Sequence, residues 1–162
     1  MTLHLVCDIS GSMSEEGKPF ILRTVVTTVA QWLRLEYGLA EIKLCAWASE
    51  ARYWPDWSVK DEFPAEMLVC EGAANGKVLA QLLGCEPSSK VLILTDGFWT
   101  TDDVRTLNRW QEGLPPDMMR VIQIGADANP YLSKRLKGAK VYAAEEVLAA
   151  LDNWLQVGEE WT

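Results

Sequence analysis

The chain has 162 residues and carries 23 acidic side chains against 15 Lys and Arg, which gives a formal net charge of −8. Hydrophobic residues make up 49% and charged residues 23%, a composition typical of a globular protein, and the length favours one domain. The negative charge argues against binding to nucleic acid or to an anionic membrane surface, because both attract basic proteins. No apolar run approaches the roughly 18 residues of a membrane-spanning helix.

Short apolar runs alternate with amphipathic stretches in the first half of the chain. Residues 3–7 are predicted to form a strand, and residues 19–36 a helix, because apolar side chains recur there at helical spacing. That stripe consists of Leu22, Val25, Val26, Val29 and Leu33. A strand is expected at 42–46, a short strand paired with it at 51–54, and a helix at 77–83.

The second half continues the alternation. Residues 91–94 form an unbroken run of β-branched and Leu side chains, which is typical of a strand that is covered on both faces. The remaining predicted elements are a helix from Asp102 or Asp103 to about 111, a strand at 121–124, a short helix after Pro130, a strand at 140–142 and a helix at 144–155.

This order predicts a three-layer, doubly wound α/β fold with a mostly parallel central sheet and one antiparallel edge strand. The strands at 3–7 and 91–95 are expected to be neighbours at its centre, since both have buried sequences followed by an aspartate. Residues 1–157 are interpreted as one domain and residues 158–162 as a short tail.

The cysteines and the first residues of the chain bear on its location. Cys7, Cys45, Cys70 and Cys85 form no CxxC pair, so we expect reduced thiols rather than a zinc site or disulfides. Residues 1–9 contain no basic leader or cleavage site, so no signal peptide is expected. Together these features favour a cytoplasmic protein.

Hydroxyl and carboxylate groups follow two of the predicted strands. Asp8, Ser10 and Ser12 come directly after the first strand, and Asp96 follows the run at 91–94. Ligands of open α/β sheets bind beyond the carboxyl ends of the strands, where these side chains are expected to meet. Their oxygen atoms suit Mg²⁺, Mn²⁺ or Ca²⁺.

The residues Asp8-Ile9-Ser10-Gly11-Ser12-Met13 resemble the DxSxS motif of the von Willebrand factor type A domain. The residues 92–97, Leu-Ile-Leu-Thr-Asp-Gly, resemble the second motif of that family, and the resemblance covers the chain from about 3 to 155. It implies a metal-ion-dependent adhesion site. Ser10 and Ser12 would bind Mg²⁺ directly, whereas Asp8 and Asp96 would act mostly through water.

One part of the family pattern is missing. The family places a threonine in the loop that corresponds to residues 71–77, but Ala73 or Ala74 stands at the hydroxyl position. Asn75, Glu71 or water could supply the oxygen in its place. Because fewer protein ligands remain, the ion is expected to be held weakly.

The resemblance also implies a partner. In such a site, the open metal position accepts an Asp or Glu carboxylate of another protein, and Phe98 and Trp99 on the adjacent loop are expected to be partner-binding anchors. The chain resembles small intracellular bacterial A-domain proteins, which often act as scaffolds in stress-response or conflict-defence systems.

Two other functions stay open. A metal-dependent phosphatase of the haloacid-dehalogenase type has a DxDGT loop after its first strand, but Ser10 stands where its second aspartate would be. A structural module with a degenerate metal site is the other alternative. An enzyme is not favoured, because His4, the only histidine, lies within a strand and no nucleophile–base pair is evident.

Overall fold

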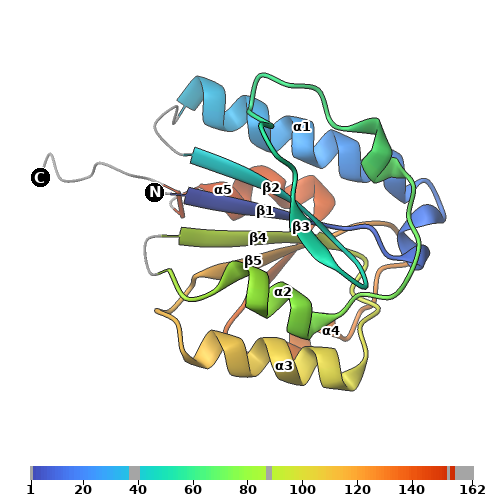
Figure 1. The fold of residues 1–162 in the computed structure, drawn as a ribbon, viewed down its shortest axis with the longest axis vertical. Coiled ribbons are helices and arrows are strands. Elements are labelled where there is room, and N and C mark those ends of the chain that lie inside the picture. Colours follow the sequence, from blue (N-terminus) through green and yellow to red (C-terminus); the bar gives the residue numbers. More distant parts are fainter. Residues whose placement is uncertain (1, 37–40, 87–88, 153, 156–162) are drawn as a thin grey trace, which may run out of the picture.

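The computed structural model describes residues 2–36, 41–86, 89–152 and 154–155, and its centre is a six-stranded sheet (Figure 1). The strand order is β3-β2-β1-β4-β5-β6, and every pair is parallel except β2 and β3. The strands are β1 (Thr2–Asp8), β2 (Glu41–Trp47), β3 (Ala51–Tyr53), β4 (Ser89–Thr95), β5 (Met119–Gln123) and β6 (Lys140–Ala143). The predicted fold class is therefore confirmed, including the antiparallel edge strand.

Helices cover both faces of this sheet (Figure 1). The α-helices are α1 (Lys18–Glu36), α2 (Gly76–Leu83), α3 (Thr101–Glu112), α4 (Leu132–Arg135) and α5 (Val147–Leu151), and short 3-10 turns lie at η1 (Gly11–Ser14), η2 (Ala65–Leu68) and η3 (Ala144–Glu146). α1 and α5 pack on one face, and α2, α3 and α4 pack on the other. The domain thus has the three layers that the sequence predicts.

The two strands at the centre of the sheet carry the candidate site. β1 lies between β2 and β4, with Leu5 opposite both Leu44 and Leu92, so the predicted neighbours are confirmed. β1 and β4 are almost entirely buried because helices cover both of their faces, which explains their unalternating apolar sequences. Their parallel pairing brings both carboxyl ends to one edge of the sheet.

The last predicted helix is shorter than expected. α5 ends at Leu151, whereas the sequence predicts a helix from 144 to 155. The carbonyl of Ala150, which a longer helix would use internally, accepts a hydrogen bond from the Arg120 guanidinium at 2.8 Å. This bond satisfies the Ala150 carbonyl where the chain leaves the helix at Asp152, whose ψ is 136°. The predicted tail at 158–162 lies outside the described residues.

Membrane insertion has no support in the helices. Within the described ranges, none of them combines the length and the hydropathy that crossing a bilayer requires.

Candidate functional site

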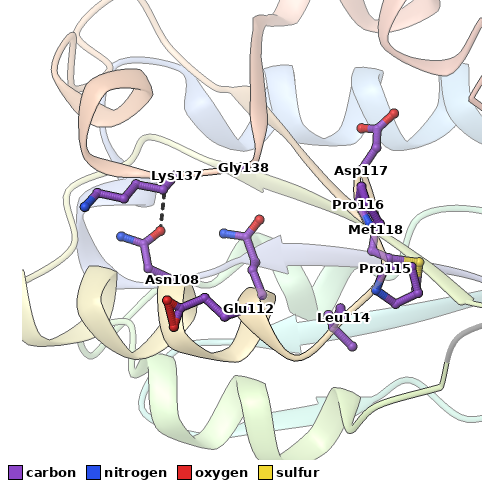
Figure 2. A pocket seen from close by; sticks show the side chains of 10 residues that line it. Asn108, Glu112, Leu114, Pro115, Pro116, Asp117, Met118, Lys137 and Gly138 are labelled. Atoms are coloured by element: carbon purple, nitrogen blue, oxygen red, sulfur yellow. Dashed lines mark hydrogen bonds between the residues drawn. The ribbon is translucent and has the colours of Figure 1, made fainter.

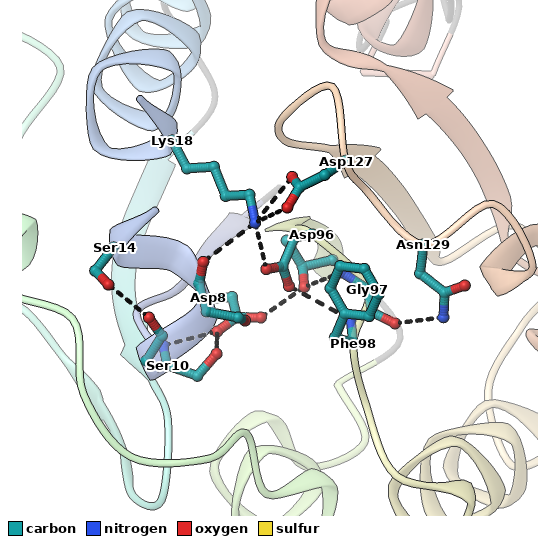
Figure 3. A network of polar contacts seen from close by, with 12 residues as sticks. Asp8, Ser10, Ser14, Lys18, Asp96, Gly97, Phe98, Asp127 and Asn129 are labelled. Atoms are coloured by element: carbon teal, nitrogen blue, oxygen red, sulfur yellow. Dashed lines mark hydrogen bonds and ion pairs between the residues drawn. The ribbon is translucent and has the colours of Figure 1, made fainter. Parts of the chain in front are cut away.

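The candidate site lies at the carboxyl ends of β1 and β4 (Figure 3). Asp8 is the last residue of β1, and Asp96 directly follows β4. Both side chains are fully buried. Two buried carboxylates need polar partners, because burying an unpaired charge costs free energy.

Asp8 obtains these partners from its own chain. One carboxylate oxygen accepts hydrogen bonds from the backbone N–H of Ser10 at 2.9 Å and from its hydroxyl at 2.6 Å. The other accepts from the Thr95 hydroxyl at 2.6 Å. Burial raises the pKa of Asp8, while the bonds from Ser10 and Thr95 oppose that shift. The predicted site residues Asp8 and Ser10 are thus joined directly.

Thr95 connects Asp8 to the following loop. Its hydroxyl oxygen accepts hydrogen bonds from the backbone N–H of Gly97 at 2.9 Å and from the indole N–H of Trp99 at 3.0 Å. Trp99 is only 5% exposed and packs edge-on against Trp47. The expectation that Trp99 is a surface anchor is therefore wrong, because its ring belongs to the core beneath the loop.

Asp96 is paired with a lysine that the sequence analysis did not consider. The Nζ of Lys18, the first residue of α1, lies 3.1 Å from Asp96 Oδ2, 3.0 Å from Asp127 Oδ1 and 3.1 Å from the carbonyl oxygen of Ser12 (Figure 3). Its side chain is 1% exposed. Burial alone would lower the pKa of Lys18, but the bonds to Asp127 and Asp96 outweigh burial and raise it, so the group is an ammonium at neutral pH.

The sequence contains a signal for this lysine. Lys18 lies four residues before Leu22, so it continues the buried apolar stripe of α1 by one turn. A charged side chain in register with a buried stripe requires a buried partner. A lysine is also unfavourable in the first turn of a helix, where the helix dipole prefers negative charge.

The loop before α2 takes part in the site through its backbone. Gly11 donates a hydrogen bond to the carbonyl oxygen of Gly72 at 2.8 Å, and Glu71 donates to the carbonyl of Ile9 at 3.0 Å. Ala73, one of the two positions where the family has a threonine, follows directly. The loop therefore packs against the DxSxS segment without supplying a side-chain oxygen at Ala73.

The two residues proposed to replace that threonine are not equivalent. Asn75 is the N-cap of α2, and its side-chain oxygen accepts hydrogen bonds from the N–H groups of Lys77 at 3.0 Å and Val78 at 3.3 Å. That oxygen is engaged in helix capping, which corrects the expectation that Asn75 is a spare donor. Glu71 is exposed.

The donor set does not fit a resident divalent cation while Lys18 lies there. A cation bound directly to the Asp96 oxygen that Lys18 contacts would lie within about 5 Å of the ammonium, where like charges repel. The family's threonine is also missing. Among the described residues, no group of three or more His, Cys, Asp or Glu side chains is placed to hold a metal. The metal role of Asp8, Ser10, Ser12 and Asp96 stays a prediction.

A separate pocket of about 350 Å³ lies at the other end of the sheet, between the end of α3 and the start of β5 (Figure 2). Leu114, Pro115, Pro116 and Met118 give it an apolar wall. It shares no residue with the carboxylate site.

Comparisons with known proteins identify the fold. No family model and no curated protein matches the sequence. Among solved structures, a von Willebrand factor type A protein from Catenulispora acidiphila aligns with a TM-score of 0.58 and 19% identity, over 94% of this chain and 40% of that one. Manganese-loaded TRAP from Plasmodium vivax gives 0.63 and 16%, over 96% and 73%.

BatB from Bacteroides thetaiotaomicron aligns over nearly its whole length, with a TM-score of 0.60, 11% identity, and coverage of 95% of this chain and 98% of that one. Identities this low establish the architecture alone. The chain has the fold of a von Willebrand factor type A domain.

Proposed function

We propose that this chain is a protein–protein interaction module whose contact surface is the carboxyl end of the sheet. The observation that carries the proposal is Phe98, an aromatic side chain that is 53% exposed on the loop after β4. Its neighbours are fixed: Gly97 bonds to Thr95 and to the Asn129 amide, and Trp99 is buried. A rigidly presented aromatic loses little conformational entropy on binding and is a typical hot spot.

Other exposed side chains on the same edge support this surface. Phe20, in the first turn of α1, is 72% exposed, and Tyr131, directly before α4, is 63% exposed. The Asp127 side chain, on the loop after β5, is 48% exposed. Exposed aromatic side chains are enriched in protein-binding surfaces.

A magnesium-bridged contact is the second candidate. In that version Asp8, Ser10, Ser12 and Asp96 hold Mg²⁺, and a partner's Asp or Glu carboxylate completes its coordination. The manganese-loaded TRAP structure, which has a similar fold, favours it. The Lys18 ammonium argues against it, so our main proposal does not include the ion.

A binding role is favoured over phosphoryl transfer. In a haloacid-dehalogenase-type site an acid would be required at position 10, but the Ser10 hydroxyl donates to Asp8. His4 lies four residues before Asp8 in β1, about 13 Å away along the strand. It is bonded to the Tyr53 hydroxyl through Nδ1 at 3.0 Å.

The free thiols of Cys7 and Cys45 support a reducing setting. On that ground we propose a cytoplasmic location. The role of a scaffold of the bacterial stress-response or conflict-defence kind is proposed from the resemblance to small A-domain proteins alone.

Site-specific photo-crosslinking in the native host tests the proposal. Phe98 is replaced by p-benzoylphenylalanine, and the matched control carries the same group at Leu35, which is 76% exposed near the other end of α1. We expect a discrete adduct at position 98, identified by mass spectrometry, and none at position 35. With the purified adduct protein, Phe98→Ala should then weaken binding by about tenfold or more, as loss of a hot spot does.

Adducts that form only at position 35, or an unchanged affinity of the Phe98→Ala variant, would contradict the proposal. Because Phe98 is half exposed, its removal should leave the thermal unfolding midpoint close to that of the unmodified protein. That measurement separates lost binding from lost folding.

A further inference from the structure

We propose that the Lys18 ammonium is a built-in cation that takes the place of the divalent ion at this site, so that the site is complete without metal. The expected effect on partner binding rests on the proposed function. The geometry of Lys18, the space made for its side chain and the charges around it support the proposal independently.

The first support is the set of contacts that the ammonium makes. Its Nζ bonds to oxygen atoms from three separate segments: Ser12 after β1, Asp96 after β4 and Asp127 after β5 (Figure 3). An adhesion-site metal has the same task, which is to hold loops from neighbouring strands together through their oxygens. Here one side chain of the protein joins them.

The second support is space. Gly125 lies directly against the lysine side chain, and a Cβ at this position would be 2.8 Å from Lys18 Cε and 3.0 Å from Lys18 Cγ. Gly125 also has a φ of +99°, a backbone conformation that residues other than glycine rarely adopt. The backbone after β5 is thus shaped to let the lysine reach the carboxylates.

The third support is charge. Asp8 and Asp96 are both completely buried, and a buried carboxylate pair needs a nearby cation or a proton. Lys18 is 1% exposed and supplies that cation directly to Asp96. A divalent ion added to this arrangement would be the second cation at a site that already has one.

Manganese binding provides the direct test. Free Mn²⁺ gives a solution EPR signal that disappears on binding, and titration of the purified protein should show no binding up to about 1 mM, the weak end of oxygen-donor sites. The Lys18→Met variant removes the ammonium while keeping an unbranched side chain, so it should gain Mn²⁺ binding. The control is Lys60→Met, an exposed lysine, which should behave like the unmodified protein.

Binding of Mn²⁺ by the unmodified protein that is lost on Asp96→Asn would overturn the proposal. So would a folded Lys18→Met variant that fails to bind. If Lys18→Met does not fold, NMR of the unmodified protein decides. A buried, hydrogen-bonded ammonium should give a slowly exchanging ¹⁵N–H₃ signal that Asp127→Asn weakens, whereas an unprotected ammonium signal would overturn the proposal.

The crosslink at position 98, repeated in cell extract, then separates this inference from the proposed function. An adduct whose yield is the same with EDTA and with added Mg²⁺ supports both. An adduct that forms only with Mg²⁺ keeps the interaction module and overturns the built-in cation. Absence of the adduct, with Mn²⁺ binding gained by Lys18→Met, overturns the interaction surface and keeps the built-in cation.

Discussion

Thr95 is the residue on which the polar core of the site depends. Its hydroxyl donates to Asp8 and accepts from Gly97 and Trp99, so one oxygen satisfies three buried groups. Thr95→Val keeps the shape but leaves these groups without that partner. We expect it to lower the free energy of unfolding by at least about 2 kcal/mol, measured by urea denaturation.

Thr95→Ser is the matched control, because it keeps the hydroxyl and removes only a methyl group. It should cost clearly less than Thr95→Val. Equal losses for the two variants would mean that packing of the methyl group, rather than the hydrogen bonds, stabilises this position.

The residues of the site show where sequence reasoning reached its limit. The motif spacing placed Asp8, Ser10 and Asp96 together because β1 and β4 are adjacent and parallel. It did not place Lys18, since the motif contains no lysine and the lysine reaches the site only along the length of its side chain. Trp99 was misplaced because its indole N–H bonds to the Thr95 hydroxyl and its ring packs against Trp47, and sequence spacing does not reveal these contacts.

Among the elements, α2 depends strongly on its cap. This helix has only eight residues, and Asn75 satisfies two of its first N–H groups. Asn75→Ala should destabilise the protein by about 1 kcal/mol, whereas Asn75→Asp, which keeps the accepting oxygen, should be close to neutral. Thermal unfolding of the two variants checks this. A loss as large for Asn75→Asp as for Asn75→Ala would exclude capping as the role of Asn75.

The order and type of the elements were predictable because each strand is a short apolar run and each long helix has an apolar stripe. The end of α5 was not, because the Arg120 side chain that satisfies the Ala150 carbonyl at this end lies about thirty residues earlier in the chain. Local periodicity cannot reveal that a side chain from another element donates a hydrogen bond to a helix carbonyl.

For the whole molecule, Asp117 and Arg120 attach the C-terminal segment to the sheet. Arg120 bonds to both carboxylate oxygens of Asp117 and to the Ala150 carbonyl, and Trp154 donates its indole N–H to the Asp117 carbonyl. Burial alone would raise the pKa of Asp117, but the Arg120 guanidinium outweighs it and holds that pKa below its ordinary value of 3.8. The ion pair therefore stabilises the fold when Asp117 is ionised.

Because the pKa of Asp117 is lower in the folded state, its stabilisation is complete above pH 3.8 and is lost as the pH falls through the folded value. Asp117→Asn, which tolerates the left-handed backbone at this position, should lower the free energy of unfolding at pH 7. The difference from the unmodified protein should shrink below about pH 4. Urea denaturation at pH 7, 5 and 3.5 measures it, and a difference that does not vary with pH would contradict the ion pair.

The backbone connection of Lys18 has a consequence for control of the site. A bound metal exchanges with the ion in solution, so a metal site is divided between loaded and empty forms in a ratio set by the free ion concentration. A lysine linked to the site by its own chain has a fixed effective concentration and cannot be diluted or chelated away. The three loops therefore keep a single arrangement when ion supply changes. On the proposed function, we expect partner binding to depend on the abundance of the two proteins and not on the supply of ions.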